Sequence, residues 1–125
     1  MKGGSSDFRF AVTAIPKQNV SGCVSSGYFP VSALDLLSTR AGYSNYGTWV
    51  TISAPGGDSD DNALPGSNTT YKNGIMSTLD KNGYGYLDGT SMACPHVSGI
   101  AGLVVSKYGG PDFTNTALKN HLITG

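Results

Sequence analysis

Short apolar runs, separated by glycine, proline and polar turn segments, divide the chain into predicted strands. Pro16 stops the first run, and Pro30 lies near the start of the second, where a missing N–H is tolerated. Pro55 and the two glycines after it end the third run. The strands predicted from this pattern cover residues 8–15, 28–36, 49–54 and 75–79, and residues 84–87 lead on towards Gly89.

Two helices are predicted in the last third of the chain. A nearly uncharged segment from Thr90 to about Lys107 is closed by Gly109-Gly110-Pro111, which is a typical helix stop signal. Thr114 is suited to cap a second helix over residues 115–123. Short apolar strands followed by an apolar helix favour an α/β fold, in which a buried sheet is covered by helices.

The long predicted helix has an unusual start and an unusual surface. Pro95 cannot donate a hydrogen bond to the Ser91 carbonyl, so the first turn is expected to be distorted there. Gly99, Ala101 and Gly102 are small, and this predicts a close approach between the helix and the sheet.

Composition narrows the classes of function. The 125 residues carry eight basic and eight acidic side chains, and this balance argues against a nucleic-acid or anionic-membrane surface. The longest apolar run is far shorter than a membrane span, and the N-terminus lacks the pattern of a secretory signal. Cys23 and Cys94 form no disulfide framework or metal spacing, and Cys94 is expected to be a buried small hydrophobic residue.

A hydroxyl lies where loop passes into the long helix. Residues 89–99 read Gly-Thr-Ser-Met-Ala-Cys-Pro-His-Val-Ser-Gly. Unpaired N–H groups and the positive end of the helix dipole lie at this junction, so Ser91 is well placed to be a nucleophile beside an oxyanion site. The same residue could serve only as a helix cap.

Residues 89–99 resemble the nucleophile motif of the subtilases, the subtilisin-like serine peptidases. Segments 31–35, 40–47, 52–57 and 75–79 are similar in order and spacing to the strands and loops that precede that motif. The resemblance covers residues 28–124 and implies a partial subtilisin-like fold, with a mostly parallel sheet and a buried helix after the nucleophile. Residues 1–27 are poorly matched, and residues 28–125 are expected to be the C-terminal part of a peptidase domain.

The resemblance implies peptide-bond hydrolysis by acyl transfer through Ser91. A histidine would take the serine proton, an aspartate would orient that histidine, and an asparagine amide with the serine N–H would hold the oxyanion. Backbone at Thr90 and Ser91 is assigned to oxyanion support, and a polypeptide is the implied substrate. The positions assigned a structural role in the motif are Gly89, Met92, Ala93, Pro95, His96 and Gly99.

The partners of Ser91 are not found upstream, although the family order places the aspartate and histidine before the serine. No histidine precedes His96, and no aspartate motif or Ala-Gly-Asn segment is present. On a helix, His96 would point about 140° away from Ser91, so it is assigned a structural role. His121 is interpreted as a surface histidine. The chain is therefore expected to be cut at both ends and inactive alone.

Two alternatives remain beside the peptidase interpretation. The chain could be a non-catalytic remnant or interaction module, or it could be half of a split peptidase that works with a chain supplying the missing half-domain. The resemblance suggests a secreted or cell-surface protein, and the sequence leaves the location open.

A short acidic segment has oxygen ligands at alternating positions. Asp58, Asp60 and Asn62 match the first three positions of a calcium loop, but Ala63 and Thr69 depart from its later positions. The segment is interpreted as a solvated loop, with calcium binding as the alternative. No other metal or cofactor site is indicated.

Overall fold

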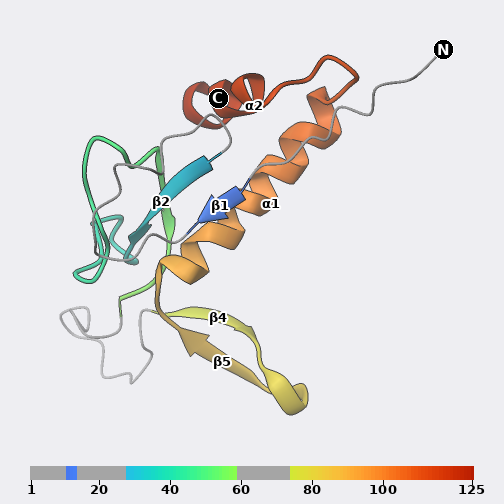
Figure 1. Ribbon diagram of the computed structural model, residues 1–125. Helices are drawn as coiled ribbons and strands as arrows, with labels where there is room; N and C mark the ends of the chain where they lie inside the picture. Colours follow the sequence, from blue (N-terminus) through green and yellow to red (C-terminus); the bar gives the residue numbers. More distant parts are fainter. Residues whose placement is uncertain (1–10, 14–27, 59–73) are drawn as a thin grey trace.

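A three-stranded parallel sheet forms the framework of the chain (Figure 1). The computed structural model describes residues 11–13, 28–58 and 74–125. The sheet has the order β1-β2-β3, with β1 at Ala11–Thr13, β2 at Tyr28–Leu34 and β3 at Ile52–Pro55. Its parallel pairing confirms the mostly parallel α/β arrangement.

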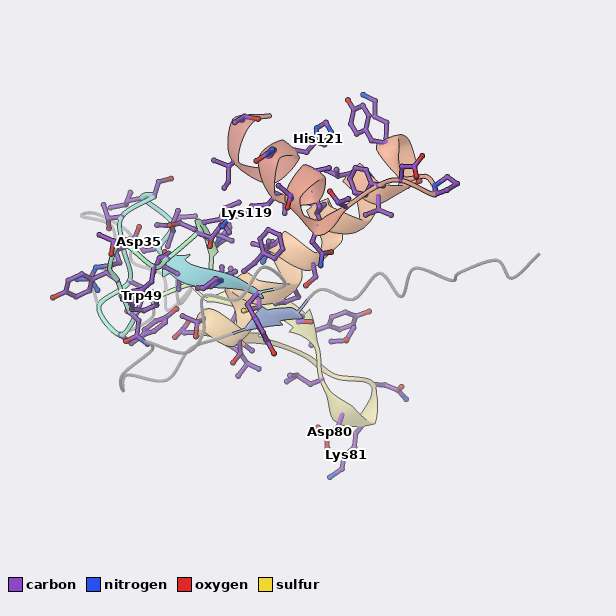
Figure 2. The ribbon with its side chains drawn as sticks, turned by 45° about the horizontal axis from the view of Figure 1, so that its top comes forward. Asp35, Trp49, Asp80, Lys81, Lys119 and His121 are labelled. Atoms are coloured by element: carbon purple, nitrogen blue, oxygen red, sulfur yellow. The ribbon has the colours of Figure 1, made fainter. Side chains whose placement is uncertain are left out.

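The predicted fourth strand belongs to a separate antiparallel hairpin and not to the buried sheet. Strand β4 (Ile75–Thr78) pairs with β5 (Tyr84–Leu87) across a short 3-10 turn, η1, at Asp80–Asn82. The hairpin projects from the N-terminal end of the long helix (Figure 1), and Asp80 and Lys81 lie at its tip (Figure 2). Most residues of its two strands are exposed, so the burial predicted for the apolar run at residues 75–79 is wrong.

Both predicted helices are present within two residues of their expected bounds. Helix α1 spans Thr90–Tyr108 and runs continuously through Pro95. Helix α2 spans Asn115–Thr124, and the Thr114 hydroxyl accepts a hydrogen bond from the Ala117 N–H at 3.2 Å, which confirms the predicted cap. Helix α1 lies along the sheet and α2 packs against α1 (Figure 1).

The core lies between the sheet and these two helices and has two parts. The part nearer the start of α1 joins the sheet to the first three turns of the helix, and the other joins β2 to both helices. The buried members of the first part are Val31, Ala33, Ala41, Ala54, Ala93, Cys94 and Val97. Those of the second part are Phe29, Ala101 and Leu118. Helix α1 therefore contributes to both parts.

Only one side of α1 is buried, whereas its apolar composition predicted that most of the helix surface would be buried. Ile100 is 52% exposed and Leu103 is 72% exposed, although both are large aliphatic residues. Gly99 and Gly102 also face open space, because a Cβ atom at either position would meet nothing within 4 Å. The expected close approach to the sheet is wrong for these two glycines and is confirmed for Ala101, which is buried against β2. Ala93 makes a second such contact.

Cys94 is buried and free, as its position in the apolar helix predicted. Burial raises the pKa of its thiol, which disfavours the thiolate that metal binding or nucleophilic attack would require. Among the helices of the described residues, none is long and apolar enough to cross a membrane.

The two-part core predicts a contrast between two leucines on the helices. Leu118→Ala should lower the free energy of unfolding by about 2–5 kcal/mol, because Leu118 is 0% exposed and its loss leaves a cavity. Leu103→Ala is the matched control and should change it by less than about 0.5 kcal/mol. Urea denaturation followed by circular dichroism measures both. Equal losses in the two variants would contradict the described core.

Candidate active site

Ser91 lies in the first turn of α1 and its side chain is exposed. Gly89 precedes the helix with φ 151° and ψ 159°, a conformation that is essentially restricted to glycine. Thr90 and Ser91 are the first helical residues, so their N–H groups have no acceptor one turn earlier within the helix. The fold thus presents a hydroxyl and backbone donors together at a positive helix end.

The start of α1 is attached to the sheet by a backbone hydrogen bond. The Gly89 N–H donates to the Gly56 carbonyl at 2.9 Å, and Gly56 directly follows β3. The Gly89 carbonyl in turn accepts from the Met92 N–H at 2.9 Å and begins the helical pattern. Ser91 is therefore held beside the carboxyl end of a parallel strand, the edge at which sites form in open α/β sheets.

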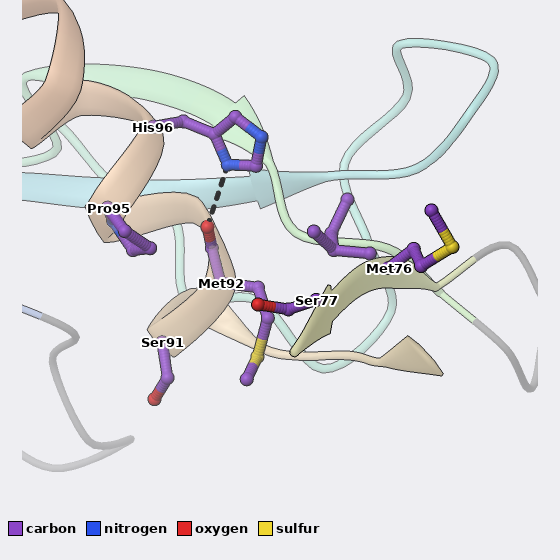
Figure 3. Close-up of a pocket in the computed structure, with 7 residues that line it drawn as sticks. Met76, Ser77, Ser91, Met92, Pro95 and His96 are labelled. Carbon is purple, nitrogen blue, oxygen red and sulfur yellow. Dashed lines mark hydrogen bonds between the residues drawn. The ribbon is translucent and has the colours of Figure 1, made fainter. Parts of the chain in front are cut away.

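An open pocket of about 340 Å³ lies between the start of α1 and strand β4 (Figure 3). Its apolar part comes from both elements, and Ser91 is one of its polar members. The residues that line it are Ile75, Met76, Ser77, Ser91, Met92, Pro95 and His96. Four positions of the 89–99 motif thus share one pocket, and β4 adds a wall that sequence reasoning did not assign to the site.

His96 lines the pocket but is held away from the serine. Its Nδ1 atom donates to the Met92 carbonyl at 2.8 Å, within its own helix. The Ser91 side chain and the His96 ring point to different sides of the first turns of α1 (Figure 3). In this arrangement His96 is not positioned to take the proton of the Ser91 hydroxyl.

His121 lies on α2, where it is half-buried and packed against two aromatic rings (Figure 2). Its ring stacks on Tyr108 with ring centroids 4.5 Å apart and planes 8° apart. Phe113 flanks it at 6.2 Å. This histidine joins the ends of the two helices and takes no part in the pocket beside Ser91.

Asp58 is buried and makes a structural contact. Its Oδ2 atom accepts from the Gly42 N–H at 2.6 Å, which ties the loop after β2 to the segment after β3. Asp60 and Asn62 lie outside the described residues. Within the ranges that the structure describes, no group of three potential metal ligands comes together.

Tyr43 and Gly56 also support the start of α1, and sequence reasoning did not single them out. The Tyr43 hydroxyl donates to the Gly56 and Gly57 carbonyls. The only sequence signal was the Pro-Gly-Gly stop after β3, which indicated a strand end and gave no hint of a contact with Gly89.

Comparison with known proteins bears directly on this site. The family model described as "Subtilase family" matches residues 14–125, which includes all of α1 and the pocket. The chain belongs to the subtilase family. The resemblance carried by residues 89–99 is thereby confirmed, and the fold around Ser91 is that of a subtilase.

Two curated relatives are named as proteolytic enzymes and are much longer than this chain. A thermophilic serine proteinase of Bacillus sp. strain AK1 is 43% identical over 77 residues, which are 62% of this chain and 15% of that protein. Alkaline elastase YaB of Bacillus sp. strain YaB is 39% identical over 92 residues, 74% of this chain and 20% of the relative.

A solved structure agrees with this relationship. A protease from Pseudoalteromonas arctica PAMC 21717 aligns with a TM-score of 0.63 and 32% identity over 78% of this chain. The aligned part is 28% of that protease. This chain therefore spans less than a third of each of these three proteins.

The backbone at Gly89 predicts opposite effects for two Gly→Ala variants. Gly89→Ala should lower the free energy of unfolding by about 1–3 kcal/mol, because alanine disfavours φ 151°. Gly102→Ala should raise the free energy of unfolding by about 0.5–1 kcal/mol, because alanine favours the helix and its Cβ atom would meet no neighbour here. Urea midpoints of the two variants test the contrast, and a loss for both would show that Gly102 is constrained after all.

Proposed function

We propose that this chain supplies the serine nucleophile of an endopeptidase that cleaves polypeptides by acyl transfer. The observation that carries the proposal is the placement of Ser91, exposed at the start of α1, beside a pocket and at the carboxyl end of the sheet. Membership of the subtilase family and the protease names of its relatives support a serine peptidase segment.

In the proposed reaction the Ser91 oxygen attacks the substrate carbonyl and its proton passes to a general base. The tetrahedral oxyanion is held by backbone N–H groups at the helix start, with the Ser91 N–H as the central donor and Thr90 in support. Collapse releases the amine, which takes up the proton, and leaves an ester on Ser91. Water then attacks this ester with the help of the same base and restores the hydroxyl.

The base and its orienting carboxylate are proposed to come from polypeptide outside these 125 residues, in the same protein or in a second chain. The two histidines of the sequence are otherwise engaged, since His96 bonds to its own helix and His121 stacks on Tyr108. A serine without a base is a weak nucleophile, so the 125 residues alone are expected to have little peptidase activity.

A second candidate is a binding module without catalysis, or a catalytically silent remnant. The observation in its favour is the pocket itself, whose walls include Ile75, Met76 and Pro95 and which could hold an apolar group without any reaction at Ser91. Calcium binding at Asp58, Asp60 and Asn62 remains a proposal of the sequence and is independent of both candidates.

Labelling with a fluorophosphonate separates these functions, because the probe reacts with an activated serine. The chain is mixed with the part of a related subtilase that precedes the matched region, which carries the base. We expect labelling of Ser91 to accelerate by at least about 100-fold over the chain alone, the typical contribution of a general base. Mass spectrometry locates the label and the rate gives the acceleration.

Ser91→Ala should abolish this labelling, and Ser106→Ala, an exposed serine at the other end of α1, should leave it unchanged. Acceleration without peptide cleavage would limit the activity to acylation. Formation of a complex with no acceleration would refute the nucleophile role and favour the binding module.

A further inference from the structure

One hydroxyl group outside the 89–99 motif reaches the backbone that holds Ser91. Tyr43 lies in the loop after β2 and is partly buried. Its single hydroxyl hydrogen is shared between two carbonyls, that of Gly57 at 2.5 Å and that of Gly56 at 3.0 Å. A tyrosine here therefore makes contacts that a phenylalanine of the same shape could not make.

The Gly56 carbonyl is shared between two donors. It accepts from the Tyr43 hydroxyl and also from the Gly89 N–H, the latter at 2.9 Å. The Gly56 N–H donates to the Leu34 carbonyl at 3.0 Å, which fixes Gly56 to β2. A Cβ atom at Gly56 would lie 2.8 Å from the Gly89 carbonyl oxygen, so the two backbones are in close contact.

We propose that Tyr43 is a positioning residue for Ser91, acting through the Gly56 carbonyl on Gly89 and the first turn of α1. The phenol holds this carbonyl in the orientation that receives the Gly89 N–H. The Gly89–Gly56 bond then sets where α1 begins and where the Ser91 hydroxyl and N–H lie. The relevance of this position to catalysis rests on the proposed function, whereas the hydrogen-bonded link itself does not.

The loop that carries Tyr43 is held in place by backbone hydrogen bonds. It is joined to β2 by the Ala41 N–H, which donates to the Ala33 carbonyl at 3.0 Å, and by the Ser44 hydroxyl, which accepts from the Ala33 N–H at 2.8 Å. The Gly42 N–H donates to Asp58. The backbone on both sides of Tyr43 is therefore held to β2 and to Asp58, which fixes the position from which the phenol reaches Gly56.

Tyr43 remains a donor over the whole physiological pH range. Burial is the largest cause and raises the pKa of its phenol to about 12. A hydrogen bond with the Gly89 backbone lowers this pKa, and the charges of Asp88 and Asp58 raise it. Because the phenol is neutral below this pKa, its contribution to the link is present at neutral pH and is lost only as the pH rises through about 12.

Amide hydrogen exchange of the 125-residue chain tests the link without any need for catalysis. In Tyr43→Phe we expect the Gly89 amide to exchange about 5–10 times faster, the change typical of one lost hydrogen bond. The Ala101 amide, in the middle of α1, should keep its rate. Tyr46→Phe is the matched control, because Tyr46 lies in the same loop but is 72% exposed, and it should change neither rate.

Two unnatural residues at position 43 keep the test decisive if Tyr43→Phe folds poorly. para-Aminophenylalanine restores a donor and should bring the Gly89 rate to within about twofold of the tyrosine protein. para-Methylphenylalanine has a similar size and no donor, and it should exchange as fast as the phenylalanine variant. Equal Gly89 rates in these two proteins would overturn the proposal, as would an equal rise at Gly89 and Ala101, which would indicate a role in overall stability alone.

The labelling reaction with the complementing subtilase part then tests the consequence for Ser91. Tyr43→Phe should slow fluorophosphonate labelling by about 5-fold or more. Faster Gly89 exchange with unchanged labelling would remove the role in positioning the nucleophile. If no protein labels at all, the proposed function fails, while the exchange rates still decide whether the link exists.

Discussion

The hydrogen bond between the Gly89 N–H and the Gly56 carbonyl joins the two halves of the described structure. Gly56 directly follows β3 and Gly89 directly precedes α1. The bond therefore holds the first turn of the helix at the carboxyl end of the strand. Both positions exclude a side chain, Gly56 by lack of space and Gly89 by its backbone angles. Ser91 is placed by this contact together with the packing of Ala93 and Val97 against the strands.

Most elements could be predicted because local chemistry determines their limits. Pro-Gly-Gly ends β3, Gly109 ends α1 and Thr114 caps α2, and each signal acts within a few residues. The separate hairpin and the one-sided burial of α1 could not be predicted, because they depend on which surfaces meet in three dimensions. A run such as Ile75–Thr78 has the same apolar pattern whether it joins a sheet or a hairpin.

The site was predictable where its residues are adjacent in sequence and not where they are distant. The motif at 89–99 located Ser91 and placed His96 on another side of the helix, because both follow from helical geometry. The contributions of Tyr43, Gly56 and the β4 wall come from segments up to 46 residues away from Gly89. Nothing in the sequence around these residues indicates which distant residue each one contacts.

The composition of α1 also bears on the order in which the protein folds. Pro95, Gly99 and Gly102 together cost the helix about 5 kcal/mol relative to alanine, so α1 cannot be stable as an isolated segment. It depends on burying Ala93 and Val97 against the strands. The helix must therefore form with the sheet or after it, and a partly folded chain carries the serine without the geometry of a nucleophile.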